Sequence, residues 1–463
     1  MGLSDLFKKK TEENAADNAA ENGKKTTSSG THYLSGKEIR EIAKANQQEM
    51  RRLEKEKNRK LPPSAYTTQM KNENNILEVE NLHSYFFTDQ GVVKAVNGVS
   101  FDIPLNATVG VVGESGCGKS VTSMSIMRLL QGPSGQIVDG SIRFKTVDYM
   151  RDKNGKFIPE YETDENGNVV YEEVKSKSGK IKTDKNGEPL RRPKQAKDKS
   201  GLGLYKKEEV VYDIARMPIN EMYRLRGRQM AMVFQEPMTS LNPVFTIGNQ
   251  LDEVTLLHVP GATKEFAKER SIQMLNMVGI AMAERVYASY PHELSGGMRQ
   301  RIMIAMALAG EPRLIIADEP TTALDVTIQA QILELFNDLK TRINGSILLI
   351  THDLGVIAEM ADYVVVMYAG RIIEKGTASE IFHNPCHPYT QGLQKSKPTM
   401  KSSDDRLFNI PGNVPNPVDM PDYCYFKERC GKCVKQCAGK YPEMVQVSPT
   451  HFVACHLYQP RND

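Results

Sequence analysis

Short, almost wholly apolar runs recur along the chain, and each has the length of a strand. Four of them hold few polar residues, which is typical of strands buried on both faces of a parallel sheet. They cover residues 108–112, 229–234, 314–317 and 346–350. Apolar positions at helical spacing lie over residues 121–130, from Leu251 to Val278, and over 302–309. The pattern therefore predicts an α/β fold.

Shorter strands are expected before these runs, over residues 76–80, 92–96 and 99–103, so the folded domain is predicted to start near Ile76. Residues 1–74 are polar, and such a composition cannot offset the entropy of ordering, so most of this extension is expected to be disordered. One helix is predicted inside it, because Ser35 and Glu38 fit a capping box. A solvated helix is the default interpretation, and a helix that docks on a partner or a membrane is the alternative.

A charged segment interrupts the fold over residues 146–212. The tetrads Asp-Lys-Asn-Gly, Asp-Glu-Asn-Gly and Asp-Lys-Asn-Gly begin at Asp152, Asp164 and Asp184. Asn-Gly between alternating stretches indicates a hairpin turn, so this segment is predicted to be a protruding β-hairpin insertion. Calcium loops are disfavoured, because such a loop needs its glycine at the sixth position and these tetrads have it at the fourth.

The overall charge and hydropathy restrict the classes of partner. The chain has 463 residues and a formal net charge of +3, which gives no argument for a nucleic-acid partner. No run of 18 apolar residues and no charged-then-apolar leader occurs in the sequence. We therefore expect an intracellular protein, or one peripheral to a membrane on that side.

A phosphate-binding loop follows the first buried run. Gly113, Glu114, Ser115, Gly116, Cys117, Gly118, Lys119 and Ser120 fit the pattern G-x-x-x-x-G-K-[ST]. A strand precedes this loop and a helix follows it, so its N–H groups and the helix N-terminus are expected to bind phosphates. Lys119 would reach the β- and γ-phosphates, and the Ser120 hydroxyl would ligate Mg²⁺. A glycine-rich turn without a ligand is the simpler alternative.

Polar residues end two later strands. Asp318 and Glu319 follow the run 314–317; the first is expected to hold Mg²⁺ through water, and the second to polarise an attacking water. His352 follows the run 346–350, at a sheet edge where parallel sheets bind ligands, although a lone histidine is more often structural.

The order of these motifs resembles an ATP-binding cassette (ABC) ATPase. The set comprises the loop 113–120, Gln235, the segment 294–297, Asp318-Glu319, the segment 323–325 and His352. The resemblance implies that Phe86, or its neighbour Tyr85, stacks on adenine and that Gln235 senses Mg²⁺ and the transmembrane partner. It also implies that Glu319 is the catalytic carboxylate and that His352 contacts the γ-phosphate. Ser295, Gly296 and Gly297 would bind the ATP held by an opposite subunit, so a dimer is implied.

Several segments, such as 234–243, 318–327 and 387–390, resemble the D-type ATPase subunits of bacterial oligopeptide and dipeptide importers. This resemblance implies a phosphate-loop (RecA-like) nucleotide-binding domain over 75–385, with an antiparallel β subdomain, a helical subdomain over 238–305 and a tail over 386–463. It further implies an F-type ATPase as heterodimer partner, two transmembrane permease subunits, an extracellular substrate-binding protein, and a peripheral place on the cytoplasmic face of the cell membrane. Import of nickel chelates and a soluble cassette acting in translation or DNA repair are the alternatives.

Seven cysteines are unevenly placed. Five lie close together near the C-terminus, at Cys424, Cys430, Cys433, Cys437 and Cys455. In a cytosolic protein such a group indicates metal ligation before disulfides, and thiolates favour iron–sulfur clusters or zinc. The importer resemblance implies a 4Fe-4S cluster on Cys424, Cys430, Cys437 and Cys455. The additional Cys433 creates a C-x-x-C pair with Cys430, so zinc stays open, as do unligated thiols.

Overall fold

The computed structural model describes residues 35–176, 179–236, 240–322, 326–396 and 409–459. Its centre is an eight-stranded sheet, in which the five strands from β12 to β9 run parallel to one another. In spatial order the sheet contains β14 (Val445–Gln446), β15 (Phe452–Val453), β13 (Arg371–Thr377), β12 (Tyr363–Tyr368), β4 (Thr108–Val112), β11 (Ser346–Ile350), β10 (Leu314–Asp318) and β9 (Met230–Val233). Every residue of β4, β9, β10 and β11 is buried, which explains why these strands are almost wholly apolar in sequence.

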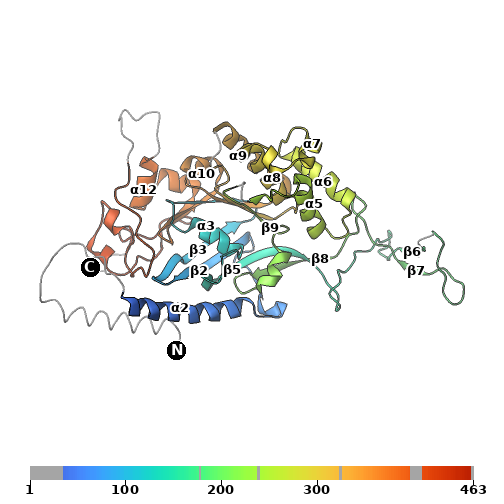
Figure 1. Cartoon of the computed structure of the whole chain (residues 1–463), viewed down its shortest axis with the longest axis horizontal. Helices are drawn as coiled ribbons and strands as arrows, with labels where there is room; N and C mark the ends of the chain where they lie inside the picture. Colours follow the sequence, from blue (N-terminus) through green and yellow to red (C-terminus); the bar gives the residue numbers. More distant parts are fainter. Residues whose placement is uncertain (1–34, 177–178, 237–239, 323–325, 397–408, 460–463) are drawn as a thin grey trace.

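A five-stranded antiparallel sheet packs on one face of the central sheet (Figure 1). It contains, in order, β1 (Thr67–Thr68), β8 (Lys207–Asp213), β5 (Gly135–Tyr149), β2 (Asn75–Thr88) and β3 (Gly91–Pro104). The two short strands expected over 92–103 are one strand, β3. A bulge at Gly98, where φ is 77°, interrupts the pairing of β3 with β2. In the sequence, a glycine in a bulge cannot be told from a glycine in a turn, so one strand was predicted as two.

Helices cover the other face of the central sheet. They are α5 (Ile247–His258), α6 (Lys264–Met277), α7 (Ala283–Ala288), α8 (Gly296–Leu308), α9 (Val326–Ile343), α10 (Leu354–Met360), α11 (Ala378–His383) and α12 (Pro388–Lys395). Five short 3₁₀ turns complete the described elements: η1 (Pro63–Ala65), η2 (Ile219–Arg224), η3 (Pro291–Glu293), η4 (Lys427–Arg429) and η5 (Lys435–Ala438). α5, α6 and α7 contact one another, and α5 and α6 also contact α8.

Two hydrophobic cores result, one on each face of the central sheet. On β10, Ile315 belongs to the core shared with the helices, whereas Leu314 and Ile316 belong to the core shared with the antiparallel sheet. Helix α3 (Lys119–Ile126) lies in the second core, between the two sheets. The alternation of side chains along a strand thus gives the molecule three layers.

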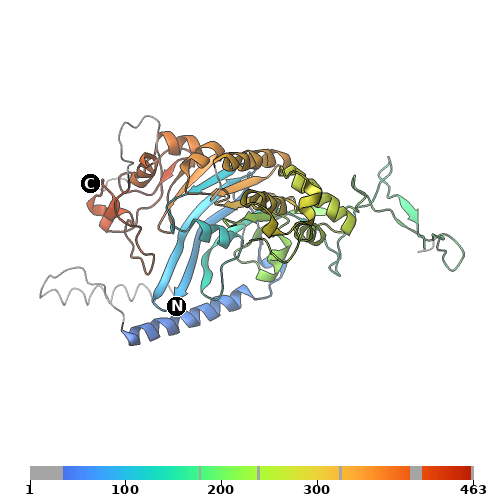
Figure 2. The same cartoon turned by 45° about the horizontal axis from the view of Figure 1, so that its top comes forward.

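The N-terminal helix α2 (Gly36–Lys57) lies along the antiparallel sheet (Figures 1 and 2). Ser35 and Glu38 form the capping box. The default interpretation of a solvated helix is wrong, because Leu53 is buried and Asn46 Nδ2 donates to the carbonyl oxygen of Thr88 (2.6 Å). The folded domain also starts earlier than expected, since Tyr66 is in its core. The rest of the extension, residues 1–34, lies outside the described residues.

A long arm leaves the body over residues 150–206 (Figure 1). It consists of short hairpins, including β6 (Tyr171–Glu173) with β7 (Arg191–Pro193). Besides the three expected turns, a further turn of the described residues begins at Asp198. The expected limits of the insertion, 146 and 212, fall inside β5 and β8, so its base is part of the antiparallel sheet.

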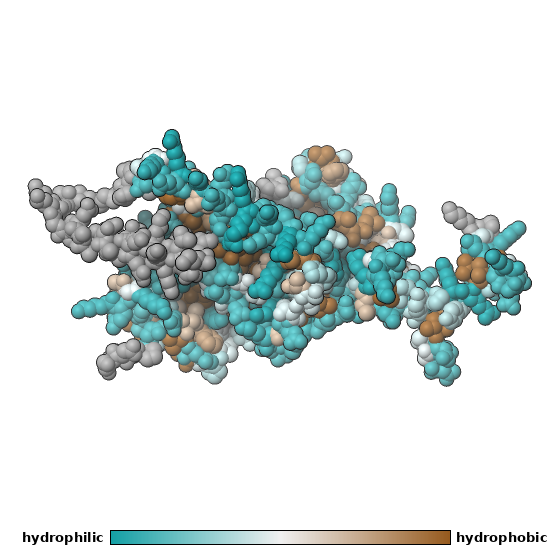
Figure 3. All heavy atoms as spheres, turned by 90° about the horizontal axis from the view of Figure 1, so that it is seen from below, coloured by the Kyte–Doolittle hydropathy of each residue, from teal (hydrophilic) through white to brown (hydrophobic). Residues whose placement is uncertain are grey.

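Figure 3 shows a few brown, apolar patches among the hydrophilic surface of the arm, and four large apolar or aromatic side chains of the arm are exposed. They are Val169, Tyr171, Ile181 and Leu190. Among the described helices, none combines the length and the apolar character that crossing a bilayer requires.

Candidate functional site

The loop between β4 and α3 closes around its own lysine. Gly118 caps α3 with φ at 101°, in the left-handed region that favours glycine. Lys119 is buried, and its ammonium donates to the carbonyl oxygens of Gly113 (2.7 Å) and Glu114 (3.1 Å). Cys117 points into the core beneath the loop, where burial raises the pKa of its thiol. The loop and the N-terminus of α3 together present the N–H groups and the positive charge of an anion site.

Asp318 joins this loop to the central sheet. It is the last residue of β10, and its two carboxylate oxygens accept hydrogen bonds from Ser120 Oγ (3.0 Å) and Ser123 Oγ (3.2 Å). Burial raises the pKa of Asp318 above its ordinary value, and the two hydroxyl donors oppose that rise. Ser123 was not singled out from the sequence, although its place one helical turn after Ser120 puts both hydroxyls on one face of α3.

Glu319, the residue after Asp318, contacts three other side chains. Its Oε2 accepts from Gln235 Nε2 (3.0 Å) and Thr322 Oγ1 (2.9 Å), and it lies 3.4 Å from His352 Nδ1. The backbone of Glu319 has φ at 48°, which is uncommon for a residue other than glycine and occurs at functional sites. The structure thus brings together Gln235, Glu319 and His352, which the motifs selected, and adds Thr322.

One hollow of about 660 Å³ contains both the loop and this group. Its lining residues come from the antiparallel sheet, the loop, the strand ends and the C-terminal part of the chain: Phe86, Val93, Ala95, Ser115, Gly116, Gly118, Lys119, Ser120, Val121, Gln235, Glu319, Thr322, His352 and Pro417. Tyr85, the alternative to Phe86, does not line the hollow, because its hydroxyl donates to Asn97 Oδ1 (3.0 Å). Pro417 was not predicted to line the hollow. It lies there because its carbonyl oxygen accepts the N–H of Lys94 on β3 (3.0 Å).

The segment Ser295, Gly296 and Gly297 does not line this hollow. Ser295 caps α8, since its Oγ accepts the N–H of Met298 (3.3 Å). Ser295 and Gly296 are exposed, so the segment is open to another molecule. The motif residues Pro237, Met238, Ala323, Leu324 and Asp325 lie outside the described residues.

Comparison with known proteins decides the family. The oligopeptide transport ATP-binding protein AppD of Bacillus subtilis is 42% identical over 384 residues, which is 83% of this chain and 97% of that protein. The chain belongs to the ABC transporter ATP-binding proteins. OppD and DppD of the same organism are 42% and 41% identical, each over 83% of this chain, and over 89% and 96% of their own lengths.

Two family profiles agree with this assignment. The profile "ABC transporter" matches residues 96–217 and 168–322, and the profile "Oligopeptide/dipeptide transporter, C-terminal region" matches 373–437. Among solved structures, a dimeric bacterial ABC transporter cassette has a TM-score of 0.46 at 20% identity, covering 65% of this chain and 98% of that one. Membership makes ATP the nucleotide of this protein and ATP hydrolysis its reaction.

The C-terminal cysteines of this ABC protein approach one another from several segments. Cys424, Cys437 and Cys455 are buried, Cys430 is half-buried, and Cys433 is exposed. Burial, together with the neighbouring sulfurs of Cys437, Cys455 and Cys430, raises the pKa of Cys424 to about 12. Cys386 is also buried, and it packs beside Val453 and Cys455.

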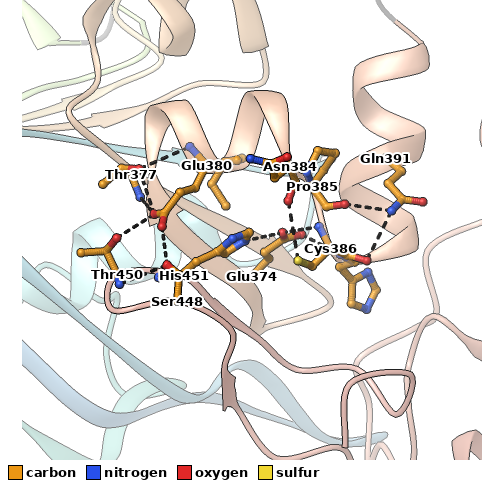
Figure 4. Close-up of polar contacts among 12 residues, drawn as sticks. Glu374, Thr377, Glu380, Asn384, Pro385, Cys386, Gln391, Ser448, Thr450 and His451 are labelled. Carbon is orange, nitrogen blue, oxygen red and sulfur yellow. Dashed lines mark hydrogen bonds and ion pairs between the residues drawn. The ribbon is translucent and has the colours of Figure 1, made fainter.

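A second polar group ties the C-terminal part of the chain to β13 (Figure 4). Ligand atoms of Glu374, Cys386 and His451 lie within 4.8 Å of one another, as a metal site would require. The Glu374 carboxylate, however, already accepts the N–H of Cys386 (2.6 Å) and of His387 (2.9 Å), and it lies 2.8 Å from His451 Nε2. These contacts satisfy a buried carboxylate without an ion, so we interpret the group as a hydrogen-bonded anchor for the start of α12.

Proposed function

We propose that this chain is the ATP-hydrolysing subunit of an importer that takes up peptides. ATP hydrolysis is supported by the position of Glu319, which lines the same hollow as Lys119 and Ser120. Gln235, Thr322 and His352 hold the Glu319 carboxylate there. A carboxylate next to a phosphate loop is placed to orient water toward the γ-phosphate. Peptides are the proposed cargo because AppD, OppD and DppD are named for oligopeptide and dipeptide transport.

The proposed roles follow the geometry of the hollow. Phe86 would stack on adenine, and the loop residues that line the hollow would hold the phosphates, namely Ser115, Gly116, Gly118, Lys119 and Ser120. Ser120, Gln235 and Asp318 offer hydroxyl, amide and carboxylate oxygens, which are the donors that Mg²⁺ prefers. When bound, Mg²⁺ neutralises the charge that develops on the phosphates. Glu319 would act on the water, and His352 would contact the γ-phosphate.

The proposed partners are a second, F-type ATPase, two permease subunits and a substrate-binding protein. The segment Ser295, Gly296 and Gly297 supports a dimer, because it lies apart from the chain's own hollow and its first two residues are exposed, open to an ATP held by the partner. We place the chain on the cytoplasmic face of the cell membrane. The proposed helical subdomain, residues 238–305, contains α5, α6, α7 and the first part of α8, where this segment lies.

Uptake by cells tests the function. A strain that lacks the chain would receive the wild type, Glu319→Gln or the control Glu311→Gln, whose side chain is 70% exposed and pairs with Arg270. We expect the wild type and the control to restore uptake of labelled peptides, and Glu319→Gln to fail. Restored uptake of nickel chelates instead of peptides would assign the alternative cargo.

Copurification separates transport from a soluble role. From mild detergent, a tagged chain is expected to bring down two integral membrane proteins and a second cassette ATPase. A chain that purifies with ribosomes or repair proteins would contradict the importer.

For the C-terminal cysteines we propose a structural 4Fe-4S cluster on Cys424, Cys430, Cys437 and Cys455. These four thiols, three of them buried and one half-buried, form a soft donor set that suits iron–sulfur clusters and zinc alike. The spacing of Cys424, Cys430 and Cys437 along the chain lacks the C-x-x-C pairs of most zinc sites, which favours the cluster.

Anaerobic purification with metal analysis tests this proposal. We expect about four irons and four sulfides per chain, with a broad visible band that is lost in Cys430→Ser and kept in the control Cys433→Ser. A colourless protein with one zinc and no iron would contradict the cluster.

A further inference from the structure

Glu114, in the phosphate loop, has a separate partner for each of its polar groups. Its N–H donates to the hydroxyl of Tyr389 (2.8 Å), and its carbonyl oxygen accepts from Lys119 Nζ (3.1 Å). Its carboxylate accepts two hydrogen bonds from Arg429, from Nη1 at 2.7 Å and from Nη2 at 3.0 Å. Tyr389 and Arg429 both come from the C-terminal part of the chain, so that part holds the phosphate loop from outside.

Arg429 is also held by partners other than Glu114. Its side chain is 5% exposed, and it donates to the carbonyl oxygens of Pro411 (2.9 Å) and Ile410 (3.3 Å). Of all contacts, the hydrogen bond to Glu114 has the largest effect on the pKa of Arg429, and it raises that pKa above its ordinary value. A guanidinium with several fixed donors loses little freedom when it binds a carboxylate with two parallel hydrogen bonds.

Tyr389 is fixed by the anchor of Figure 4. The Glu374 carboxylate holds the N–H groups of Cys386 and His387, and His387 Nδ1 accepts the N–H of Tyr389 (3.0 Å). The ring of Tyr389 is fully buried and packs on the ring of Tyr368. The position of its hydroxyl, and with it the N–H of Glu114, therefore depends on the C-terminal tail.

The pairing matters because Glu114 places a negative charge inside a loop that must bind phosphates. Without a cation beside it, that carboxylate would repel the phosphates and would compete for Lys119. The contact with Arg429 neutralises the charge, and Glu114 does not line the hollow. We infer that Arg429 is a positioning residue for ATP binding, which it promotes by neutralising Glu114 and keeping it out of the phosphate site.

The inference rests on the proposed ATP site, and a double-mutant cycle on the purified full chain tests it. MgATP affinity would be measured by titration for the wild type, Arg429→Ala, Glu114→Gln and the double variant. We expect Arg429→Ala to bind MgATP about tenfold more weakly or worse, since hydrogen bonds between charged groups are lost. Glu114→Gln should bind at least as tightly as the wild type, and the double variant should return to within about threefold of it.

Lys427→Ala provides the matched control, because Lys427 lies on the same turn η4 but pairs with Glu428 (3.6 Å) at the surface. It should leave the affinity unchanged. Arg429→Lys keeps the charge without the fork, so it should lie between Arg429→Ala and the wild type.

Two results would overturn the inference. If Arg429→Ala binds MgATP as the wild type does, Arg429 does not position the loop. If Arg429→Ala causes the same loss in the Glu114→Gln background, the loss comes from a disturbed fold and not from the carboxylate. A wild-type chain that fails to bind MgATP would instead overturn the ATP site itself.

Discussion

The side-chain amide of Gln235 donates a hydrogen bond to the carboxylate of Glu319 (3.0 Å), although 84 positions separate the two residues. Gln235 follows β9 and Glu319 follows β10, and these strands are parallel neighbours in the central sheet. Because parallel strands end at the same edge, both side chains reach one place beside the phosphate loop. The site is therefore a consequence of strand order.

Replacing Glu319 with Gln is expected to abolish turnover and to leave MgATP binding intact. The amide keeps the shape of the side chain but cannot accept a proton from water, which costs roughly 10²-fold or more in rate. Phosphate release by the assembled importer, with MgATP titration in parallel, measures both effects. Turnover within a factor of a few of the wild type would show that Glu319 is not the catalytic carboxylate, or that the partner ATPase carries the active site.

Lys119→Ala is expected to weaken MgATP binding about tenfold or more, since it removes the positive charge buried in the loop. Titration of the full chain measures the affinity. Lys153→Ala is the control, because Lys153 is exposed in the first turn of the arm. Equal affinities for the two variants would contradict the role of Lys119.

The arm is expected to be dispensable for ATP hydrolysis, but its base is not. A Gly-Ser linker in place of residues 151–205 should leave a soluble chain that binds MgATP. Replacing residues 148–210 should prevent folding, because Asp148 is buried, pairs with Arg224, and accepts from the hydroxyl of Tyr212 (3.2 Å).

The single substitution Asp148→Ala isolates this contact within the full-length chain. It should cost roughly 1–3 kcal/mol of unfolding free energy, since the hydroxyl of Tyr212 loses its acceptor and Arg224 keeps only its ion pair with Glu221 (3.1 Å). The exposed Asp152→Ala is the control and should cost far less. Similar unfolding midpoints in urea for both variants would contradict the buried pair.

His387 is expected to make the fold less stable in acid. Burial lowers its pKa from 6.5 to about 3, so between these values the unfolded chain binds a proton that the folded chain does not. The free energy of unfolding that depends on neutral His387 is complete above pH 6.5. It is lost as the pH falls toward 3, at up to roughly 1.4 kcal/mol per pH unit. Urea unfolding at pH 7.5 and 5.5 measures the slope.

His387→Asn keeps a side chain that can cap α12 and removes the titrating group, so the acid-dependent loss should become smaller. The exposed His292→Asn should keep the slope of the wild type. An unchanged slope in His387→Asn would contradict the prediction.

Local patterns revealed four of the eight described strands of the central sheet, namely β4, β9, β10 and β11. β4 and β11 have the predicted limits, because strands buried on both faces are continuous apolar runs and turn residues bound them. The phosphate loop was equally visible, since its glycines, lysine and serine are consecutive. Where a local signal had two meanings the prediction was wrong, as at Gly98, where a bulge inside β3 resembled a turn.

By itself the sequence determined the four strands β4, β9, β10 and β11, the phosphate loop, the acidic residues at the end of β10 and the chemical identity of the donors. Only the tertiary structure decided which distant groups meet. Arg429 binds Glu114 across 315 positions, Pro417 reaches the hollow through β3, and α2 packs on the antiparallel sheet. Such contacts leave no trace in local periodicity, because a hydrogen bond or an ion pair depends on distance in space and on exclusion of water, and spacing along the chain specifies neither.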